Sequence, residues 1–181
     1  RKFFSNRLKC VVDVGANKGQ SIDFFLSLNQ HCIIHAIEPN PDLFLKLKRK
    51  YARLENIKLY NVGISNITGL KKFHENIFDY TSSFEELDSQ SDYLKSKAMV
   101  LGVSPEKIIT KSYPVPVTTL NSLLADNNIT EVDVLKIDTE GHEYYCLEGL
   151  FSNDFGASIK FIQIESHNDD MYKNPIPFSQ I

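Results

Sequence analysis

Four residues suited to binding a small molecule follow the first apolar run of the chain. Asp13, Gly15, Asn17 and Gly19 alternate along CVVDVGANKGQS, residues 10–21, between a strand-like run and the beginning of an expected helix. Glycine permits positive φ angles and lets a ligand approach the backbone closely, and a helix N-terminus attracts anionic groups. The stretch therefore predicts a cradle for a small cofactor, with a purely structural strand-to-helix turn as the alternative.

An acidic residue further along the chain indicates a nucleoside. Glu38 ends the second expected strand, about 20 residues after the glycine loop, where an acid commonly accepts hydrogen bonds from ribose hydroxyls. The dinucleotide fingerprint G-x-G-x-x-G is not met, because alignment on Gly15 places Asn17 and Gln20 at the other glycine positions. The D-x-G-x-N-x-G spacing instead suits S-adenosylmethionine, and we expect the amides near Asn17 and the Glu38 carboxylate to hold opposite ends of it.

A further cofactor contact is expected at the end of the third strand, which should border the adenine. The cofactor contacts expected on this basis are Asp13, Gly15, Ala16, Asn17, Gly19, Ser21, Glu38, Pro39, Asn61, Val62 and Gly63. A solvated charge at the strand end is the alternative for Glu38.

Groups that could accept a proton from a hydroxyl gather after the fourth and fifth expected strands. The candidates are Asp138, Glu140, His142, Glu143, Glu165 and His167. We assign catalytic roles to Asp138, Glu165 and His167, the last because the pKa of histidine is near neutrality, although a surface position would also explain it. Lys136 completes this set, because a lysine in a central strand needs a carboxylate neighbour, for which Glu165 is the leading candidate. A structural ion pair is the alternative for Lys136.

A divalent metal is a further alternative for the same residues. Oxygen-rich ligands such as Asp138 and Glu165, with His167, would suit magnesium or manganese. The sequence shows no compact ligand spacing, so we assign no metal site.

The elements that must position these residues follow from the apolar pattern. Strands are expected at 10–14, 32–38, 57–65, 132–138 and 159–165, and helices at 19–29, 42–53, 119–127 and 140–151. This alternation predicts a parallel sheet with helices on both faces. Right-handed crossovers place strands two and three on one side of the first strand and strands four and five on the other. The glycine loop then meets the loop after the fourth strand, where such sheets bind ligands.

Residues 66–118 interrupt this alternation. They contain a turn with a further expected strand, a polar and partly helical segment, and the extended stretch SYPVPVTTL, whose prolines exclude a helix. Long insertions of this kind are often lids or binding loops, so we expect this one to face the substrate, with a peripheral decoration as the alternative. We expect residues 1–181 to form a single domain that includes this insertion.

Five stretches together resemble the FkbM family of S-adenosylmethionine-dependent methyltransferases. They are VVDVGANKGQS, IEPNP, YNVGIS, SSF and VLKIDTEGHEYYCLEGL. The resemblance implies the class I methyltransferase fold, a Rossmann-like three-layer α/β/α sandwich with a mostly parallel sheet. It also implies O-methylation of a hydroxyl on a sugar or a small natural-product-like acceptor. It further implies that Asp138, at the end of the fourth strand, is a cofactor contact as well and faces the methionine end of the cofactor or the substrate. A non-catalytic protein, or an NAD- or nucleotide-binding Rossmann-like protein, is the alternative.

The resemblance also raises a question about the last strands of the sheet. The family fold implies the strand order 3-2-1-4-5-7-6, whereas the apolar runs predict strands one to five only. We therefore expect the C-terminal strands to be missing, so that the chain is a fragment or another chain or element covers the fifth strand. An exposed edge strand favours association, which leaves a homodimer open.

Composition narrows the class of partner. The net charge of −3 and the pI of about 6.0 do not favour nucleic acid, and no apolar run is long enough to span a membrane. Cys10, Cys32 and Cys146 lack the spacing of metal ligands, which favours buried reduced thiols and a cytoplasmic location. We therefore expect a small hydroxylated molecule as the partner.

Overall fold

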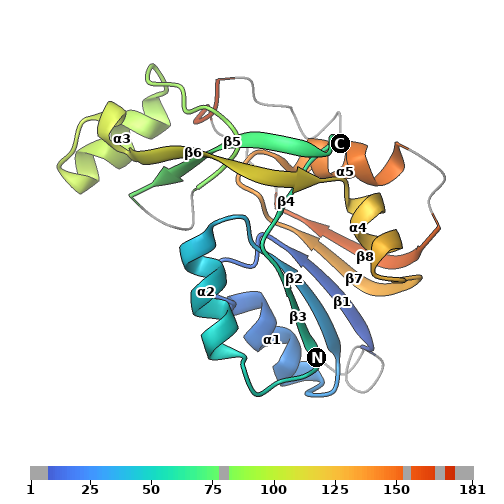
Figure 1. Ribbon diagram of the computed structural model, residues 1–181. Helices are drawn as coiled ribbons and strands as arrows, with labels where there is room; N and C mark the ends of the chain where they lie inside the picture. The colour runs from blue at the N-terminus through green and yellow to red at the C-terminus, as the bar shows by residue number, and fades with distance from the viewer. Residues whose placement is uncertain (1–7, 78–81, 153–155, 166–169, 174–181) are drawn as a thin grey trace.

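Five parallel strands form the central sheet of the protein (Figure 1). The structure is a computed structural model, and it describes residues 8–77, 82–152, 156–165 and 170–173. The strand order is β3-β2-β1-β7-β8, as the crossover argument predicts. The bounds of these strands, in spatial order, are β3 Ile57–Tyr60, β2 Ile33–Ile37, β1 Cys10–Val14, β7 Glu131–Ile137 and β8 Ser158–Ile164.

Two pairs of helices cover the two faces of this sheet. One face packs against α1 (Gln20–Leu28) and α2 (Pro41–Lys50), and the other against α4 (Leu120–Asp126) and α5 (Glu143–Phe151). Consecutive strand residues alternate between the two cores, since Val11 belongs to the first and Val12 to the second. This three-layer α/β/α arrangement confirms the predicted fold class.

Local sequence signals explain where α2 begins and ends. Asn40 precedes the helix, and its side-chain oxygen accepts hydrogen bonds from the N–H groups of Asp42 and Leu43. Pro41 occupies the first helical position, where its missing N–H has no cost, and three basic residues form the last turn, where they suit the helix dipole. These contacts fix the position at which α2 begins. They thereby also restrict the short segment between β2 and α2, and Glu38 lies in that segment.

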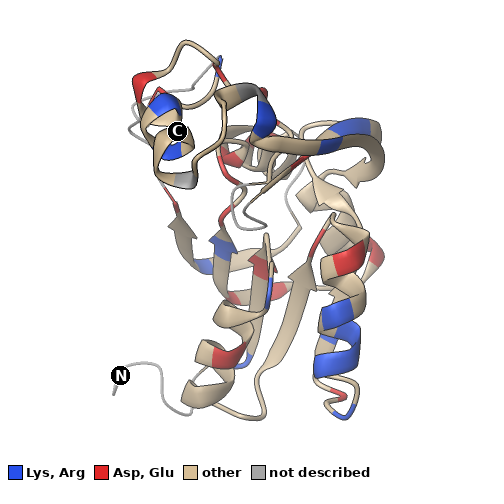
Figure 2. Cartoon of the chain, turned by 90° about the vertical axis from the view of Figure 1, so that its left-hand side faces the viewer, with Lys and Arg blue, Asp and Glu red and all other residues tan. Residues whose placement is uncertain are grey.

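The insertion forms a second sheet together with β4, which directly precedes it. The strand order in this sheet is β4 (Gly63–Ile64), β6 (Ile109–Thr118) and β5 (Gly69–Asn76), and α3 (Asp92–Leu101) and a 3₁₀-helix, η2 (Pro105–Lys107), lie between β5 and β6 along the chain. Figures 1 and 2 show this sheet and α3 beyond the carboxyl ends of the central strands. The further strand that the sequence predicts in this region is β5, and the extended proline stretch lies in β6.

The expectation of one strand over 57–65 is wrong in its second half. The chain leaves the central sheet after Tyr60, where the Asn61 side chain donates hydrogen bonds to the carbonyl groups of Glu38 and Pro39. After this bend, Gly63 pairs with Val117 of the second sheet. The chain therefore moves from one sheet to the other within three residues, at the edge where ligands are expected.

Charge is distributed unevenly over these elements. Figure 2 shows basic residues along α2 and acidic segments near the tips of the central strands. No helix within the described ranges is both long and apolar enough to cross a membrane.

Candidate active site

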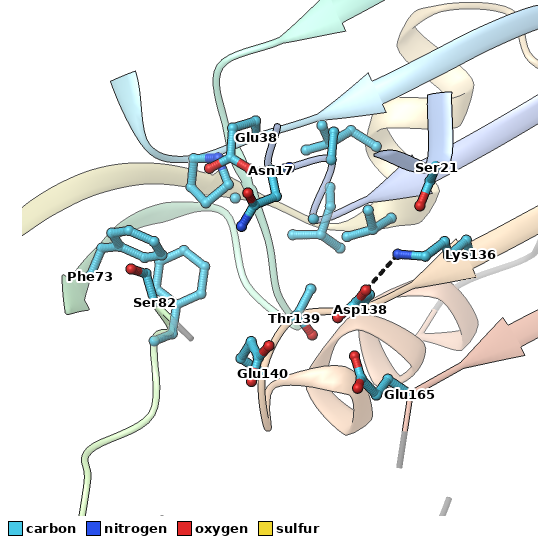
Figure 3. A pocket seen from close by; sticks show the side chains of 18 of the residues that line it. Asn17, Ser21, Glu38, Phe73, Ser82, Lys136, Asp138, Thr139, Glu140 and Glu165 are labelled. Carbon is cyan, nitrogen blue, oxygen red and sulfur yellow. Dashed lines mark hydrogen bonds and ion pairs between the residues drawn. The ribbon is translucent and has the colours of Figure 1, made fainter. Parts of the chain in front are cut away.

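A cavity of about 320 Å³ lies at the carboxyl ends of the central strands. This volume lies within the range of about 300–1,000 Å³ that small-molecule sites occupy. Ten residues of the expected site line the cavity, and they come from the ends of β1, β2, β7 and β8 and from the beginnings of α1 and β4 (Figure 3). They are Gly15, Ala16, Asn17, Ser21, Glu38, Pro39, Gly63, Lys136, Asp138 and Glu165.

Four expected cofactor contacts do not line the cavity, each for a physical reason. Gly19 is covered by Tyr51, whose hydroxyl donates to the Gly19 carbonyl, and the Asn61 side chain is bound to backbone carbonyls. Val62 packs against the core beside α4 and α5. Asp13 is completely buried behind the loop. His167 lies outside the described residues, so its role stays a prediction.

The glycine loop after β1 packs closely against the ends of the neighbouring strands and also lines the cavity. Gly15 has a φ of 86°, and a Cβ atom there would lie 1.8 Å from the carbonyl oxygen of Asp138. The N–H groups of Gly15 and Ala16 both donate to the carbonyl of Ile37, at 3.1 and 3.0 Å. The loop is therefore held against the ends of β2 and β7, and close packing alone already requires a glycine at position 15.

Glu38 is fixed at the cavity wall by two backbone groups. Its Oε2 accepts from the Asn17 N–H at 2.8 Å, and its Oε1 accepts from the Asn40 N–H at 2.8 Å. The Asn17 amide and the Glu38 carboxylate thus bond to each other, so the expectation that they hold opposite ends of one ligand is wrong. Asn17 and Glu38 lie at the same end of the cavity (Figure 3).

Lys136 lies among carboxylates, as expected, but its partners differ from the leading candidate. Its Nζ is 2.7 Å from Asp138 Oδ2 and 3.6 Å from Asp13 Oδ1, and within the described part of the chain it forms no ion pair with Glu165. Asp13 and Lys136 are direct partners in the β1–β7 ladder. Burial raises the pKa of Asp13 to about 6, although the nearby ammonium of Lys136 acts in the opposite direction.

Three carboxyl groups gather at the other end of the cavity. Oxygen atoms of Asp138, Glu140 and Glu165 lie within 4.8 Å of one another. A hydrogen bond with Asp138, followed by burial, raises the pKa of Glu165 to about 7. Burial, followed by the charges of Asp138 and Glu165, raises the pKa of Glu140 to about 8. These groups can hold or accept a proton near neutral pH, and their spacing would also suit a divalent cation.

Glu140 was expected only as one of several candidate bases, and the structure gives it a more specific position. Its φ is 56°, in the left-handed region that few residues other than glycine adopt. Its side chain lines the cavity, and the Tyr172 hydroxyl lies 3.4 Å from its Oε2. No periodic pattern surrounds Tyr172 in the sequence, so nothing there indicated this contact.

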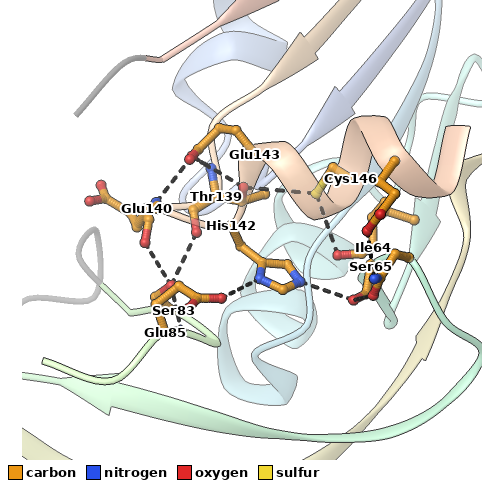
Figure 4. Close-up of polar contacts among 12 residues, drawn as sticks. Ile64, Ser65, Ser83, Glu85, Thr139, Glu140, His142, Glu143 and Cys146 are labelled. Atoms are coloured by element: carbon orange, nitrogen blue, oxygen red, sulfur yellow. Dashed lines mark hydrogen bonds and ion pairs between the residues drawn. The ribbon is translucent and has the colours of Figure 1, made fainter. Parts of the chain in front are cut away.

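Glu143 and His142 lie beneath the cavity instead of lining it. The Glu143 carboxylate accepts hydrogen bonds from the N–H groups of Thr139 and Gly141 and from the Thr139 hydroxyl. It therefore stabilises the loop after β7, as a residue at a helix N-terminus does. His142 is buried in the polar network of Figure 4.

The insertion supplies one wall of the cavity, while its expected contact with the substrate stays a prediction. Phe73, Ser82 and Phe84 line the cavity, and the Phe73 and Phe84 rings meet edge to face with centroids 5.3 Å apart. These residues were not predicted individually, because which insertion residue reaches the cavity depends on the β5–β6 pairing.

A parallel sheet of this order, with a glycine loop after β1 and an acid after β2, is the fold of Rossmann-like methyltransferases. Residues 13–179 match the family model for the methyltransferase FkbM domain, and the chain belongs to that family. It is similar to the 2-O-methyltransferase NoeI of Sinorhizobium fredii (strain NBRC 101917 / NGR234), with 21% identity over 173 residues, 94% of this chain and 68% of NoeI. No solved structure matches the chain.

Proposed function

We propose that the protein uses S-adenosylmethionine to methylate a hydroxyl group of a sugar or a small natural-product-like acceptor. Membership of the FkbM family and the similarity to a 2-O-methyltransferase support methyl transfer. The observation that carries the choice of cofactor is the chemistry of the cavity, which has a carboxylate for hydroxyls at one end and a carboxylate cluster at the other.

The two ends of the cavity suit the two ends of that cofactor. Glu38 is oriented by backbone N–H groups, and a carboxylate can accept about four hydrogen bonds, which suits a ribose diol. Pro39 and Phe73 add apolar surface beside it, suited to a purine. A positively charged sulfur beside Asp138, Glu140 and Glu165 would favour the ionised forms of these carboxyl groups, because opposite charges attract strongly in a partly buried site.

When bound, this cofactor supplies an activated methyl group that is transferred to oxygen while the pair of electrons of the broken S–C bond stays on sulfur. Asp138 and Glu165 lie where an acceptor hydroxyl could approach, and the carboxylate of either can take up its proton as the C–O bond forms. Lys136 orients Asp138 through their 2.7 Å contact. The Phe73 and Phe84 rings of the insertion make one side of the cavity apolar.

The acceptor class follows from the same groups. Carboxylates accept hydrogen bonds from hydroxyls and repel anions, so we propose a neutral polyhydroxylated acceptor in preference to a phosphorylated one. The three free cysteines suit a reducing compartment, and the proposal places the reaction in the cytoplasm.

Calorimetric titration with S-adenosylmethionine, with NAD in parallel, tests the cofactor. We expect binding of the first only, and Glu38→Gln should weaken it about tenfold through the loss of charge-assisted hydrogen bonds. Glu55→Gln is the matched control, because Glu55 is exposed and does not line the cavity. Binding of NAD alone, or equal affinity of Glu38→Gln and the parent, would contradict the proposal. A methyl-release assay over neutral and phosphorylated sugars then tests the acceptor class.

A further inference from the structure

His142 joins segments that lie far apart in the sequence. Its Nδ1 is 2.6 Å from Oε1 of Glu85 in the insertion, and its Nε2 is 3.0 Å from Oγ of Ser65, which follows β4 (Figure 4). The partners are 57 and 77 positions away along the chain, and the imidazole itself is fully buried. The side chain of His142, at the beginning of α5, therefore connects the insertion to the elements that surround the central sheet.

The direction of these hydrogen bonds follows from the state of the ring. Burial lowers the pKa of His142, with the hydrogen bond to Glu85 acting in the opposite direction, so the imidazole is neutral and has one donor and one acceptor nitrogen. An ionised carboxylate only accepts. The proton therefore belongs on Nδ1, which donates to Glu85, while Nε2 accepts from the Ser65 hydroxyl.

The insertion segment that His142 holds is part of the cavity wall. Ser82 and Phe84 both line the cavity, whereas His142 does not. The Phe84 ring lies 5.1 Å from the His142 ring. It also contacts Gly63 so closely that a Cβ atom there would lie 2.4 Å from it. The position of Phe84 thus depends on the ring beneath it and on the bond that secures its neighbour Glu85.

A second attachment ties the same segment to the loop that carries Glu140. The Ser83 hydroxyl lies 2.6 Å from the carbonyl oxygen of Glu140 and 3.3 Å from that of Thr139. Ser83 and Glu85 therefore contact two successive parts of the loop after β7. Between them they hold the segment 82–85 at a fixed distance from the carboxylates of the cavity.

We propose that His142 is a positioning residue that fixes the segment 82–85, through Glu85, as a preformed wall of the cavity. A wall that is already ordered lowers the entropy cost of binding, so His142 sets the affinity for the methyl donor and leaves the rate of methyl transfer nearly unchanged. The effect on affinity rests on the proposed function, whereas the effect on the segment does not.

Two isosteric variants separate the two hydrogen bonds of the ring. The amide nitrogen of asparagine is as many bonds from the backbone as Nδ1, so His142→Asn keeps a donor for Glu85. The amide nitrogen of glutamine corresponds to Nε2, so His142→Gln loses that donor. Glu85→Gln keeps an acceptor for Nδ1, and Glu85→Ala removes it. His35→Gln is the matched control, because His35 is also buried and hydrogen-bonded through Nδ1, in its case to Tyr60.

Two measurements test the proposal: hydrogen exchange of residues 82–88, and calorimetric binding of S-adenosylhomocysteine with the KM and kcat of turnover. We expect His142→Gln and Glu85→Ala to accelerate exchange and to raise the Kd and KM about tenfold, with kcat changed less than about twofold. His142→Asn, Glu85→Gln and the His35 control should stay close to the parent.

Equal losses in His142→Asn and His142→Gln would overturn the proposal, because they would show a role in core packing only. Unchanged exchange in His142→Gln would also overturn it. If the parent binds neither S-adenosylmethionine nor S-adenosylhomocysteine, the proposed function fails, while the exchange measurement still decides whether His142 holds the segment.

Discussion

At the scale of single residues, the carboxyl group of Asp13 behind the glycine loop depends on Lys136 for its compensation of charge. Asp13 has no exposure to solvent and no hydrogen-bond partner among the described residues, and its nearest charge is the ammonium of Lys136 at 3.6 Å. Burial of a carboxylate without hydrogen bonds costs free energy, and the raised pKa of about 6 reflects this cost. Asp13 therefore links the stability of the fold to pH.

The sign of this link is fixed by the direction of the shift. Below about pH 4 both the folded and the unfolded chain hold the Asp13 proton, whereas between about pH 4 and pH 6 the unfolded chain releases it first. Rising pH therefore lowers the contribution of Asp13 to the free energy of unfolding. We expect Asp13→Asn to gain stability relative to the parent, by up to about 3 kcal/mol, as pH rises through this window. Urea unfolding of both proteins at several pH values measures it, and a constant difference would contradict it.

Glu165 gives a second pH dependence, in activity. Its pKa of about 7 means that the proton-accepting form becomes populated as pH rises through neutrality, so the rate of methyl transfer should rise with it. We expect Glu165→Gln to lower kcat about 100-fold and to remove this part of the profile. The pH profile of kcat for the two proteins is the measurement, and a variant that keeps the parental rise near pH 7 would exclude Glu165 as the base.

At the scale of elements, the contact between the loops after β1 and β7 decides whether the cavity forms. Gly15→Ala adds a positive-φ penalty and a Cβ atom that would lie 1.8 Å from the Asp138 carbonyl. We expect a loss of more than about 2 kcal/mol in the free energy of unfolding, together with loss of cofactor binding. Gly102→Ala is the matched control, because Gly102 also has a positive φ, of 66°, but among the described residues no atom outside its chain neighbours lies within 4 Å of its Cβ position. Similar losses in both variants would show that the positive φ, and not the contact of the added Cβ atom with the Asp138 carbonyl, excludes alanine at position 15.

The sequence predicted the elements of the central sheet well and those of the insertion poorly. Buried parallel strands read as continuous apolar runs, so their order followed from connection rules. Strand β6 was harder to recognise because it contains Pro114 and Pro116. A strand tolerates proline where no neighbouring strand needs the missing N–H as a hydrogen-bond donor. The parallel neighbour β4 pairs only with Val117 and Thr118 of β6, beyond both prolines. Such strand pairings depend on contacts between residues that are far apart in the sequence, and the local pattern of apolar and polar residues does not encode them.

The same limit applies to the site. The need of Lys136 for a carboxylate partner follows from burial and could be predicted. Its pairing with Asp13 depends on the register of β1 against β7, which a single sequence does not determine. Glu140 is distinguished from its acidic neighbours only by its backbone conformation and its burial, and neither is visible in the pattern of residue types.

At the scale of the whole molecule, strand β8 forms one of the two edges of the central sheet. Within the described ranges β8 pairs only with β7, and Ile162 in β8 is 43% exposed. We expect these 181 residues to associate in a concentration-dependent way through this edge, and Ile162→Lys to weaken that association. Sedimentation analysis measures this, with Leu70→Lys in the second sheet as control, since Leu70 is 71% exposed. A parent that stays monomeric at all concentrations would contradict this prediction.

The three thiols of the chain have a practical consequence. Burial raises the pKa of Cys10 to about 11 and of Cys32 to about 12, and it raises that of Cys146 as well. Because only a thiolate reacts quickly with alkylating reagents, the native cysteines are nearly inert at neutral pH. A cysteine introduced at Ser82 would then be the preferred target of a maleimide dye, and its fluorescence would report from the cavity wall on the arrival of a ligand without any removal of the native thiols.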